Sequence, residues 1–239
     1  MPLSTVTYVT NKSIETVLLH LRYDSLFSDL PEGVLRELAG LCKIRKVLEG
    51  EAIHYRGDEP EGMYLVITGS VRISVLSAQG REALLSIMEA GAWFGESSLF
   101  DGLPRAYDAK AQVDTLLLIV PKAELELLLA KRPALYQNIV KLLCQRIRLS
   151  LVLLETQALL PLEGRLAQRL LLLAQDGQHV HVKVSQEDLS QMLGTTRQSI
   201  SRVLTIWQHE GLIVRRYKGI ELLNIGLLRE KAQAATQML

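Results

Sequence analysis

The spacing of apolar residues changes along the chain and divides it into segments of different structure. From Ser25 to Leu41 apolar residues recur at helical spacing, which predicts a helix there. Over the next hundred residues the period shortens to two, as in Val71, Ile73 and Val75, which alternate with polar neighbours. This alternation predicts short strands that each have one buried face and one wet face.

Glycines separate the predicted strands at short intervals. Because glycine reaches positive φ without steric cost, such positions favour tight turns. The segment Ala78-Gln79-Gly80 is predicted to join two strands of a hairpin. Many short strands with regular turns are typical of an antiparallel β-barrel or sandwich, and we expect an N-terminal antiparallel β-barrel.

The segment from Pro133 to Leu160 has the pattern of one long helix. Val140, Ile147 and Leu154 are seven residues apart, which is the spacing of a coiled-coil seam. Its apolar sector is wider than packing against one domain requires. A second, parallel copy of the helix is therefore the expected partner; the alternative is a helix buried within its own chain.

Residues 185–211 carry the signals of a helix-turn-helix. Ser185 followed by Asp188 predicts a capped helix start, and Gly194 predicts the end of that helix after about two turns. A longer helix then begins after Thr195-Thr196 and ends at Gly211. Two helices joined by a short turn that contains glycine form a helix-turn-helix.

The wet face of the second helix carries side chains suited to reading DNA. Arg197, Gln198, Ser201 and Arg202 project together from its N-terminal half, where a recognition helix meets base edges. Arginine pairs with guanine and glutamine with adenine, while serine or threonine reaches a base or a phosphate. We predict that Thr196 and these four residues contact double-stranded DNA.

Two apolar runs around the turn Tyr217-Lys218-Gly219 predict a hairpin wing. We expect Arg215, Arg216 and Lys218 at its tip to contact phosphates. The charge of this part of the chain is consistent with binding to DNA. From Pro161 onward there are ten Lys and Arg but seven Asp and Glu, although the net charge of the whole chain is only +1. The predicted domain is a winged helix-turn-helix; the alternative is a helical pair that packs on the barrel with a solvated charged face.

Composition and missing motifs exclude several classes of protein. With 48% hydrophobic and 22% charged residues the chain is globular, and no apolar run approaches the roughly eighteen residues that cross a bilayer. No GxSxG, Walker or HExxH motif is present, so we expect no enzyme and no catalytic residues. Cys42 and Cys144 lack metal-ligand spacing, so we expect no metal site and a reducing, cytoplasmic location.

The order of these parts resembles the CRP/FNR family of bacterial transcription regulators over nearly the whole chain. The C-terminal motifs are the more specific, since Gly164-Arg165 opens the linking helix and the run Thr196 to Arg202, TRQSISR, matches the recognition helix. The resemblance implies an α+β fold. Its expected parts are N-terminal helices and a jelly-roll, cyclic-nucleotide-binding-like β-barrel at residues 1–132, a dimerisation helix at 133–160 and the winged helix-turn-helix at 161–239.

The resemblance also implies partners. A regulator of this family is expected to be a homodimer that binds a palindromic operator in double-stranded DNA and contacts RNA polymerase, with no membrane involved. Effector binding in the β domain is expected to act on the DNA-binding domain through the long helix.

In the β domain, the run Gly95 to Phe100, GESSLF, followed by Pro104-Arg105 is similar to the family's phosphate-binding cassette for cyclic nucleotides. Backbone N–H groups and Arg105 suit a phosphate, and Glu96 suits a ribose hydroxyl. The expected effector-binding residues are Gly95, Glu96, Ser97, Ser98, Arg105, Ala106 and Ser150.

Two departures from the family pattern bear on the ligand. In members that bind cyclic AMP, a Ser or Thr hydroxyl after the arginine also meets the phosphate, whereas here the position is Ala106. Losing a hydrogen bond to a charged group weakens affinity about tenfold to a hundredfold. In the same members, two neighbouring hydroxyl residues on the long helix contact the adenine. Here Ser150 keeps the first of these positions, whereas the second is Leu151.

The effector therefore stays open among cyclic AMP, another anionic effector such as a cyclic dinucleotide, and a non-nucleotide signal or no ligand. An iron–sulfur sensor is disfavoured because the first forty-one residues contain no cysteine. A haem needs an axial His or Cys. His20, His54, Cys42 and Cys144 are available for that role, but no local pattern singles one out.

Overall fold

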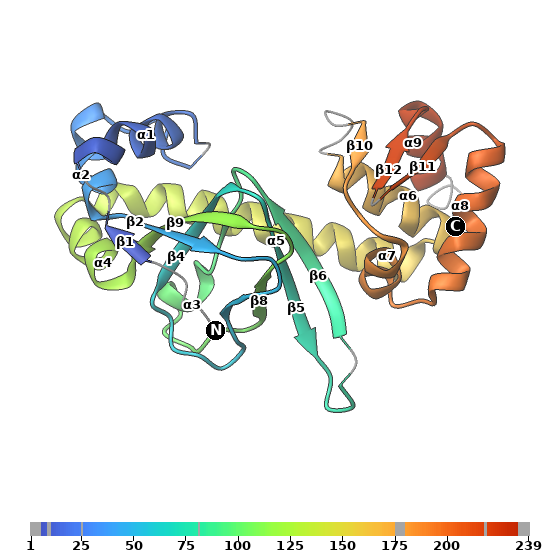
Figure 1. Ribbon diagram of the computed structural model, residues 1–239, viewed down its shortest axis with the longest axis horizontal. Coiled ribbons are helices and arrows are strands. Elements are labelled where there is room, and N and C mark those ends of the chain that lie inside the picture. Colours follow the sequence, from blue (N-terminus) through green and yellow to red (C-terminus); the bar gives the residue numbers. More distant parts are fainter. Residues whose placement is uncertain are drawn as a thin grey trace. The chain divides into compact units, whose positions relative to one another are not determined.

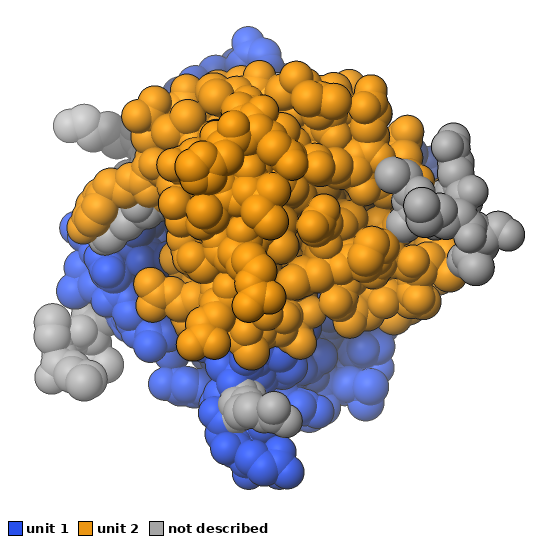
Figure 2. Space-filling view, turned by 90° about the vertical axis from the view of Figure 1, so that its right-hand side faces the viewer, with its two compact units in different colours: residues 1–146 blue, residues 147–239 orange. Residues whose placement is uncertain are grey.

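The computed structural model describes residues 6–8, 11–24, 26–80, 82–174, 180–217 and 219–233 of the 239-residue chain. The chain forms two compact units, residues 1–146 and 147–239, which are coloured separately in Figure 2. Among the helices of the described ranges we find none with the length and apolar composition that a bilayer crossing requires.

The first unit contains most of the strands (Figure 1). They are β1 (Val6–Tyr8), β2 (Lys43–Val47), β3 (Ala52–His54), β4 (Gly62–Thr68), β5 (Ser70–Leu76), β6 (Glu82–Glu89), β7 (Trp93–Phe94), β8 (Asp108–Ala111) and β9 (Thr115–Pro121). The helices that begin in this unit are α1 (Asn11–Arg22), α2 (Glu32–Leu41), α3 (Ser97–Phe100), α4 (Lys122–Lys131), the 3₁₀ turn η1 (Pro133–Leu135) and α5 (Tyr136–Leu159).

Within the described residues these strands form two antiparallel sheets, of order β1-β2-β9-β4-β7 and β3-β8-β5-β6. Val66 and Leu117 of the first sheet share one apolar cluster with Val71 and Ile73 of the second, so the sheets pack face to face. The α+β class and a jelly-roll-like fold are confirmed. The predicted barrel is not closed in the described residues, because no hydrogen-bonded ladder joins an edge strand of one sheet, β1 or β7, to an edge strand of the other, β3 or β6.

Strands β4 and β9 lie centrally in the five-stranded sheet and are buried on both faces. Tyr64 and Val66 of β4 point into the cluster between the sheets, whereas Met63 and Leu65 point to a second cluster. This second cluster also contains residues of α1, α2, α4 and the first turn of α5. Burial on both faces explains why these two strands are continuous apolar runs without alternation.

The helix predicted from Ser25 to Leu41 begins only at Glu32, so the prediction was wrong in its first part. Pro31 stands at the N-cap position with ψ of 143°, and a residue before proline is itself disfavoured in helical conformation. The preceding chain turns around Asp24, whose carboxylate accepts hydrogen bonds from the Leu26 N–H at 2.9 Å and the Trp93 indole at 2.8 Å.

Two other predicted elements are confirmed. The hairpin of β5 and β6 turns at residues 77–80, where Gly80 has φ of +75° and its N–H donates to the Ser77 carbonyl at 2.9 Å. The long helix occupies most of the predicted segment, as η1 followed by α5. Pro133 is tolerated in the first turn because backbone N–H groups there have no intrahelical acceptor, so that the missing N–H of proline breaks no hydrogen bond.

The second unit begins within the C-terminal half of α5. Its remaining elements are α6 (Leu162–Leu173), β10 (His181–Val182), α7 (Gln186–Leu193), α8 (Arg197–His209), β11 (Ile213–Arg216), β12 (Gly219–Leu222) and α9 (Ile225–Gln233). In the described residues β10, β12 and β11 form a three-stranded antiparallel sheet in that order. Leu170, Leu189, Leu204 and Leu228, from four different helices, are fully buried and form part of the core.

Candidate DNA-binding surface and effector cassette

Helix α7 has a capping box at its start and a left-handed glycine at its end. The Ser185 hydroxyl accepts the Asp188 N–H at 3.0 Å, and the Asp188 carboxylate accepts the Ser185 N–H at 3.1 Å. This reciprocal capping box satisfies two backbone donors at the helix start. Gly194 ends the helix in the left-handed region with φ of +60° and ψ of +38°. The predicted first helix and turn of the helix-turn-helix are confirmed.

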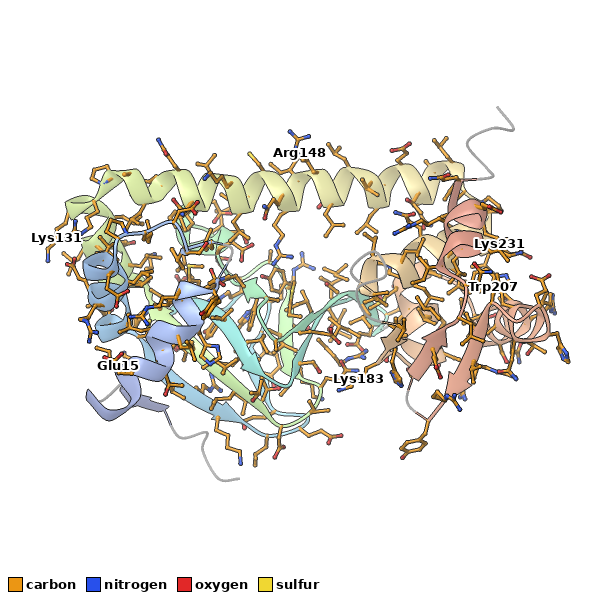
Figure 3. All side chains as sticks on the ribbon, turned by 90° about the horizontal axis from the view of Figure 1, so that it is seen from above. Glu15, Lys131, Arg148, Lys183, Trp207 and Lys231 are labelled. Carbon is orange, nitrogen blue, oxygen red and sulfur yellow. The ribbon has the colours of Figure 1, made fainter. Side chains whose placement is uncertain are left out.

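Helix α8 is fixed in rotation by its apolar face. Ile200, Val203, Leu204 and Trp207 are buried, and the Trp207 ring also lies 6.0 Å from the Lys231 ammonium (Figure 3). The Thr196 hydroxyl caps the helix by accepting the Ser199 N–H at 3.2 Å. An amphipathic helix held in this way must present its opposite face outward.

The outward face of α8 carries the residues predicted to read bases. Arg197, Gln198 and Arg202 are exposed, as is Thr196 at the cap, and Ser201 is half-buried. Neither Arg197 nor Arg202 makes a hydrogen bond or ion pair with any residue in the described ranges. The guanidinium N–H groups of both arginines are therefore open to solvent or to a bound partner.

The wing is a hairpin of β11 and β12 in which Arg216 pairs with Gly219. The Arg215 N–H and guanidinium both donate to the Gln208 side-chain oxygen on α8, at 3.2 and 3.1 Å. Arg216 donates to Glu221 at 2.7 Å. The sequence reasoning missed Gln208 and Glu221, which orient these arginines. Lys218 lies outside the described residues.

Gly164 explains how α6 approaches α9. A Cβ at this position would lie 3.2 Å from the Leu160 Cβ and 3.3 Å from the Lys231 carbonyl oxygen, tighter than ordinary contact. Only glycine fits there without displacement of its neighbours. Gly164 thus has a packing role inside the second unit.

The cassette, which we define as residues 95–105, begins in the β domain with a glycine whose φ is positive. Gly95 has φ of +83° and is followed by the short helix α3. Ser98 is buried and donates to the Pro104 carbonyl at 3.3 Å, whereas Ser97 is half-buried. Ala106, next to the cassette, and Ser150, on α5 in the second unit, are both exposed.

Arg105 is buried, with 2% of its surface exposed. Its two terminal nitrogens donate to the Gly95 carbonyl at 2.7 Å and the Gly62 carbonyl at 2.6 Å. The guanidinium also lies 5.3 Å from the centre of the Tyr64 ring. The fork of donors predicted for a phosphate is thus directed at the domain's own backbone.

Two residues that the sequence reasoning missed contact the cassette. The Tyr107 hydroxyl accepts the Gly95 N–H at 3.0 Å. Arg146, on α5, lies 3.6 Å from the buried Glu96 carboxylate and donates to the Trp93 carbonyl at 2.5 Å. Both contacts join segments separated in sequence, and no local motif signals them.

An aromatic group surrounds this cluster. The His54 ring centre lies 5.6 to 6.3 Å from those of Tyr64, Phe94 and Tyr107. Burial, with the positive Arg105 nearby, lowers the pKa of His54 to about 4. Burial and the neighbouring Glu96 carboxylate raise the pKa of Tyr107. His54 is therefore neutral and Tyr107 protonated at neutral pH.

Comparison with known proteins places both regions in one family. Residues 44–132 match the family model of the cyclic nucleotide-binding domain, and residues 164–231 match that of the Crp-like helix-turn-helix domain. The cyclic AMP receptor protein of Thermus thermophilus is 31% identical over 184 residues, which cover 77% of this chain and 85% of the relative. The chain belongs to the CRP/FNR family.

A second relative and two solved structures are also similar to this chain. A CRP-like cAMP-activated global transcriptional regulator of Mycobacterium tuberculosis is 28% identical over 191 residues, covering 77% of this chain and 85% of that protein. A CRP/FNR regulator structure from Thermus thermophilus has a TM-score of 0.66 at 27% identity, over 80% of this chain and 99% of that one. FixK2 from Bradyrhizobium japonicum, with a TM-score of 0.72 at 22% identity over 79% of this chain and 96% of that chain, supports the fold alone.

Membership in the CRP/FNR family establishes the general function. The chain is a DNA-binding transcription regulator with a cyclic nucleotide-binding-type domain. The prediction that it is not an enzyme is confirmed, since the relatives are transcription regulators.

Proposed function

We propose that this regulator acts as a homodimer whose two α8 helices read a palindromic operator. The observation that carries the proposal is the exposed face of α8, where Arg197, Gln198 and Arg202 extend from a capped and buried scaffold. Thr196 and Ser201 complete the base-reading set, with Ser or Thr able to reach a base or a phosphate. Arg215, Arg216 and Lys218 of the wing are assigned to phosphates.

The long helix supplies the proposed dimer contact. Val140, Ile147, Leu151 and Leu154 are 54%, 59%, 59% and 66% exposed, which is high for apolar side chains. Together with the exposed Cys144 they follow a four–three spacing along α5, the spacing of a two-stranded coiled-coil seam. A second copy in parallel would cover this face. The proposed division is thus residues 1–132 for sensing, 133–160 for dimerisation and 161–239 for DNA binding.

The cassette and its neighbours are proposed as the effector-sensing region, with Gly95, Glu96, Ser97, Ser98, Arg105, Ala106 and Ser150 as its expected residues. Arg146 supports coupling, because it joins the Glu96 carboxylate to helix α5. The relatives named for cyclic AMP favour a nucleotide effector. The internal bonds of Arg105 favour the second candidate, a non-nucleotide signal or no small molecule.

Two further assignments follow from the proposed function. A regulator that occupies operator DNA works where the chromosome is, so we assign it to the cytoplasm. Its expected protein partner besides itself is RNA polymerase, by family resemblance.

Selection from random double-stranded DNA, followed by footprinting, tests the DNA-reading assignment. We expect a two-fold symmetric site with half-sites about 34 Å apart. Arg202→Ala should lose about 1 to 3 kcal/mol on that site and relax the base choice at one position in each half. Arg148→Ala, at an exposed position on α5, is the matched control and should leave the selected sequence unchanged. Occupancy of a single half-site by a monomer would contradict the proposal.

The native cysteines test the dimer contact. Seam positions of a parallel coiled coil face their own counterparts, within reach of a disulfide. Mild oxidation should therefore link two chains through Cys144, and Cys144→Ser should abolish the link. Cys42→Ser is the control, because Cys42 is fully buried and burial raises its pKa to about 12. Sedimentation as a monomer, together with no crosslink, would refute the seam.

A further inference from the structure

Tyr107 is a cassette contact with no counterpart in the sequence motif. Its ring packs against the apolar cluster between the two sheets, beside His54. Its hydroxyl accepts the Gly95 N–H at 3.0 Å. Gly95 is the first residue of the cassette, and its N–H is one of the backbone donors that a bound anion would require. A side chain of the domain itself already uses this donor.

The charged donors around Tyr107 are also engaged inside the domain. Arg105 donates to the Gly95 and Gly62 carbonyls, and Arg146 to the Trp93 carbonyl. The packing is tight, since a Cβ at Gly95 would lie 2.8 Å from an Arg105 terminal nitrogen and 3.2 Å from the Tyr64 ring. A side chain larger than glycine at position 95 would therefore collide with Arg105 and Tyr64.

A bound phosphate would have to replace hydrogen bonds that Arg105, Arg146 and the Gly95 N–H already make within the domain. Of the buried side-chain atoms in the described cassette, those without a hydrogen bond are Nε of Arg105 and one carboxylate oxygen of Glu96. Among these buried side-chain atoms a phosphate diester would find one donor, and the carboxylate oxygen would repel it. Ala106 offers no hydroxyl in compensation. Breaking internal bonds to charged groups without full replacement is unfavourable.

We propose that Tyr107 is a built-in occupant of the cassette that excludes cyclic nucleotides and holds the β domain in one conformation without them. Operator binding by this chain then requires no cyclic nucleotide. Tyr107 determines ligand specificity here, because its ring fills space and its hydroxyl takes the Gly95 donor. The inference rests on the proposed function in that the cassette is taken as the sensing region of a DNA-binding dimer.

Calorimetric titration of the wild-type chain with cyclic AMP and, separately, cyclic di-GMP is the first test. We expect no binding at ligand concentrations of about 1 mM, which corresponds to an affinity weaker than about 4 kcal/mol. Operator affinity measured with and without 1 mM of each nucleotide should differ by less than about twofold. A micromolar Kd for either nucleotide, or a tenfold gain in operator affinity, would overturn the proposal.

Removal of the occupant is the second test. Tyr107→Ala frees both the space and the Gly95 N–H, and Ala106→Ser in the same chain adds a hydroxyl donor. The double variant should bind cyclic AMP about tenfold to a hundredfold more tightly than Tyr107→Ala alone. Ala106→Ser by itself should bind none, because Tyr107 is still in place. A folded double variant that binds no cyclic AMP would overturn the proposal.

Tyr107→Phe keeps the test decisive if the alanine variants do not fold. It retains the ring and removes only the hydroxyl. Hydrogen exchange at the Gly95 amide should be slow in the wild type and at least tenfold faster in Tyr107→Phe, because the protecting bond is lost. Equal exchange rates would overturn the assigned contact.

The operator measurements separate this inference from the function on which it rests. If no selected DNA is bound under any condition, the DNA-reading assignment fails, while the titrations still decide the role of Tyr107. If DNA is bound only after a cyclic nucleotide is added, the DNA-reading assignment stands and Tyr107 is not an excluding occupant.

Discussion

Arg105 of the β domain and Arg202 of helix α8 carry the same guanidinium, yet the structure uses them in opposite ways. Arg105 is buried and donates to the Gly95 and Gly62 carbonyls, so its charge belongs to the interior of the domain. Arg202 is exposed on a helix whose other face is buried. A ligand-binding motif thus specifies residue types, whereas tertiary contacts decide which of their donors a partner can use.

The largest expected effect comes from the same substitution made in both regions. Arg105→Ala leaves two buried carbonyls without their charged donors and should lower the free energy of unfolding of the β domain by about 3 to 5 kcal/mol. Arg202→Ala should change stability by less than about 0.5 kcal/mol and act on DNA binding instead. Urea unfolding checks both.

The two tryptophans allow each unit to be followed separately, because Trp93 lies in the first unit and Trp207 in the second. Arg105→Ala should shift the transition in a Trp207→Phe background, where only Trp93 emits. A small shift there, with loss of phosphate-ligand binding instead, would reverse the assignment of Arg105.

The next effect concerns His54, which is buried in the β domain, and His209, which is exposed at the end of α8. The pKa of His54 falls from an ordinary 6.5 to about 4 in the folded chain. Between these values the unfolded chain binds a proton that the folded chain does not. Stability is therefore lost as pH falls from about 6.5 to 4, by at most about 3 kcal/mol.

Unfolding measured across that pH range should show the loss in the wild type. His54→Phe should reduce the slope, because the replacement keeps the ring among its aromatic neighbours and removes the titrating group. His209→Gln should leave the slope unchanged. A wild-type slope identical to that of His54→Phe would mean that His54 is solvated and titrates normally.

The contrast between the helix-turn-helix and the cassette also explains how much could be predicted from the sequence. The helix-turn-helix depends on local signals: the Ser185 and Asp188 cap, the left-handed Gly194 and the period of the apolar face of α8. Each signal acts within one or two turns of helix, so the pattern predicts both the elements and their outward face. The exposed face of α8 was predicted for that reason, and its role in reading bases stays a prediction.

The state of the cassette depends on contacts that the sequence pattern does not encode. Arg105 meets Gly62 across 43 positions, and Arg146 meets Trp93 across 53. Tyr107 reaches back twelve positions to Gly95 across a turn. Helix α2 was likewise predicted too long because tertiary bonds around Asp24, including one from Trp93, hold residues 26–30 in turns. Pairings of this range follow from how the sheets pack.

Within the helix-turn-helix, the caps should give the largest stability effects of small substitutions. Ser185→Ala removes one half of the capping box and should cost about 1 to 2 kcal/mol, and Thr196→Ala about 1 kcal/mol. Fluorescence of Trp207 in a Trp93→Phe background reports this. Gln198→Ala, at the exposed second residue of α8, is the matched control and should cost less than about 0.5 kcal/mol. Equal losses for all three would show that the caps contribute no more than the surface.

The smallest effect is expected at the wing, where Arg216 pairs with Glu221 at 2.7 Å. Arg216→Ala should weaken binding to specific and random DNA alike. It should also reduce the slope of log affinity against log salt concentration by about one. Glu221→Gln removes the competing carboxylate and should have the opposite effect on both kinds of DNA. Fluorescence anisotropy at several salt concentrations measures the two together. An Arg216→Ala loss confined to the cognate site would place this arginine on a base edge, so that the wing would read sequence as α8 does.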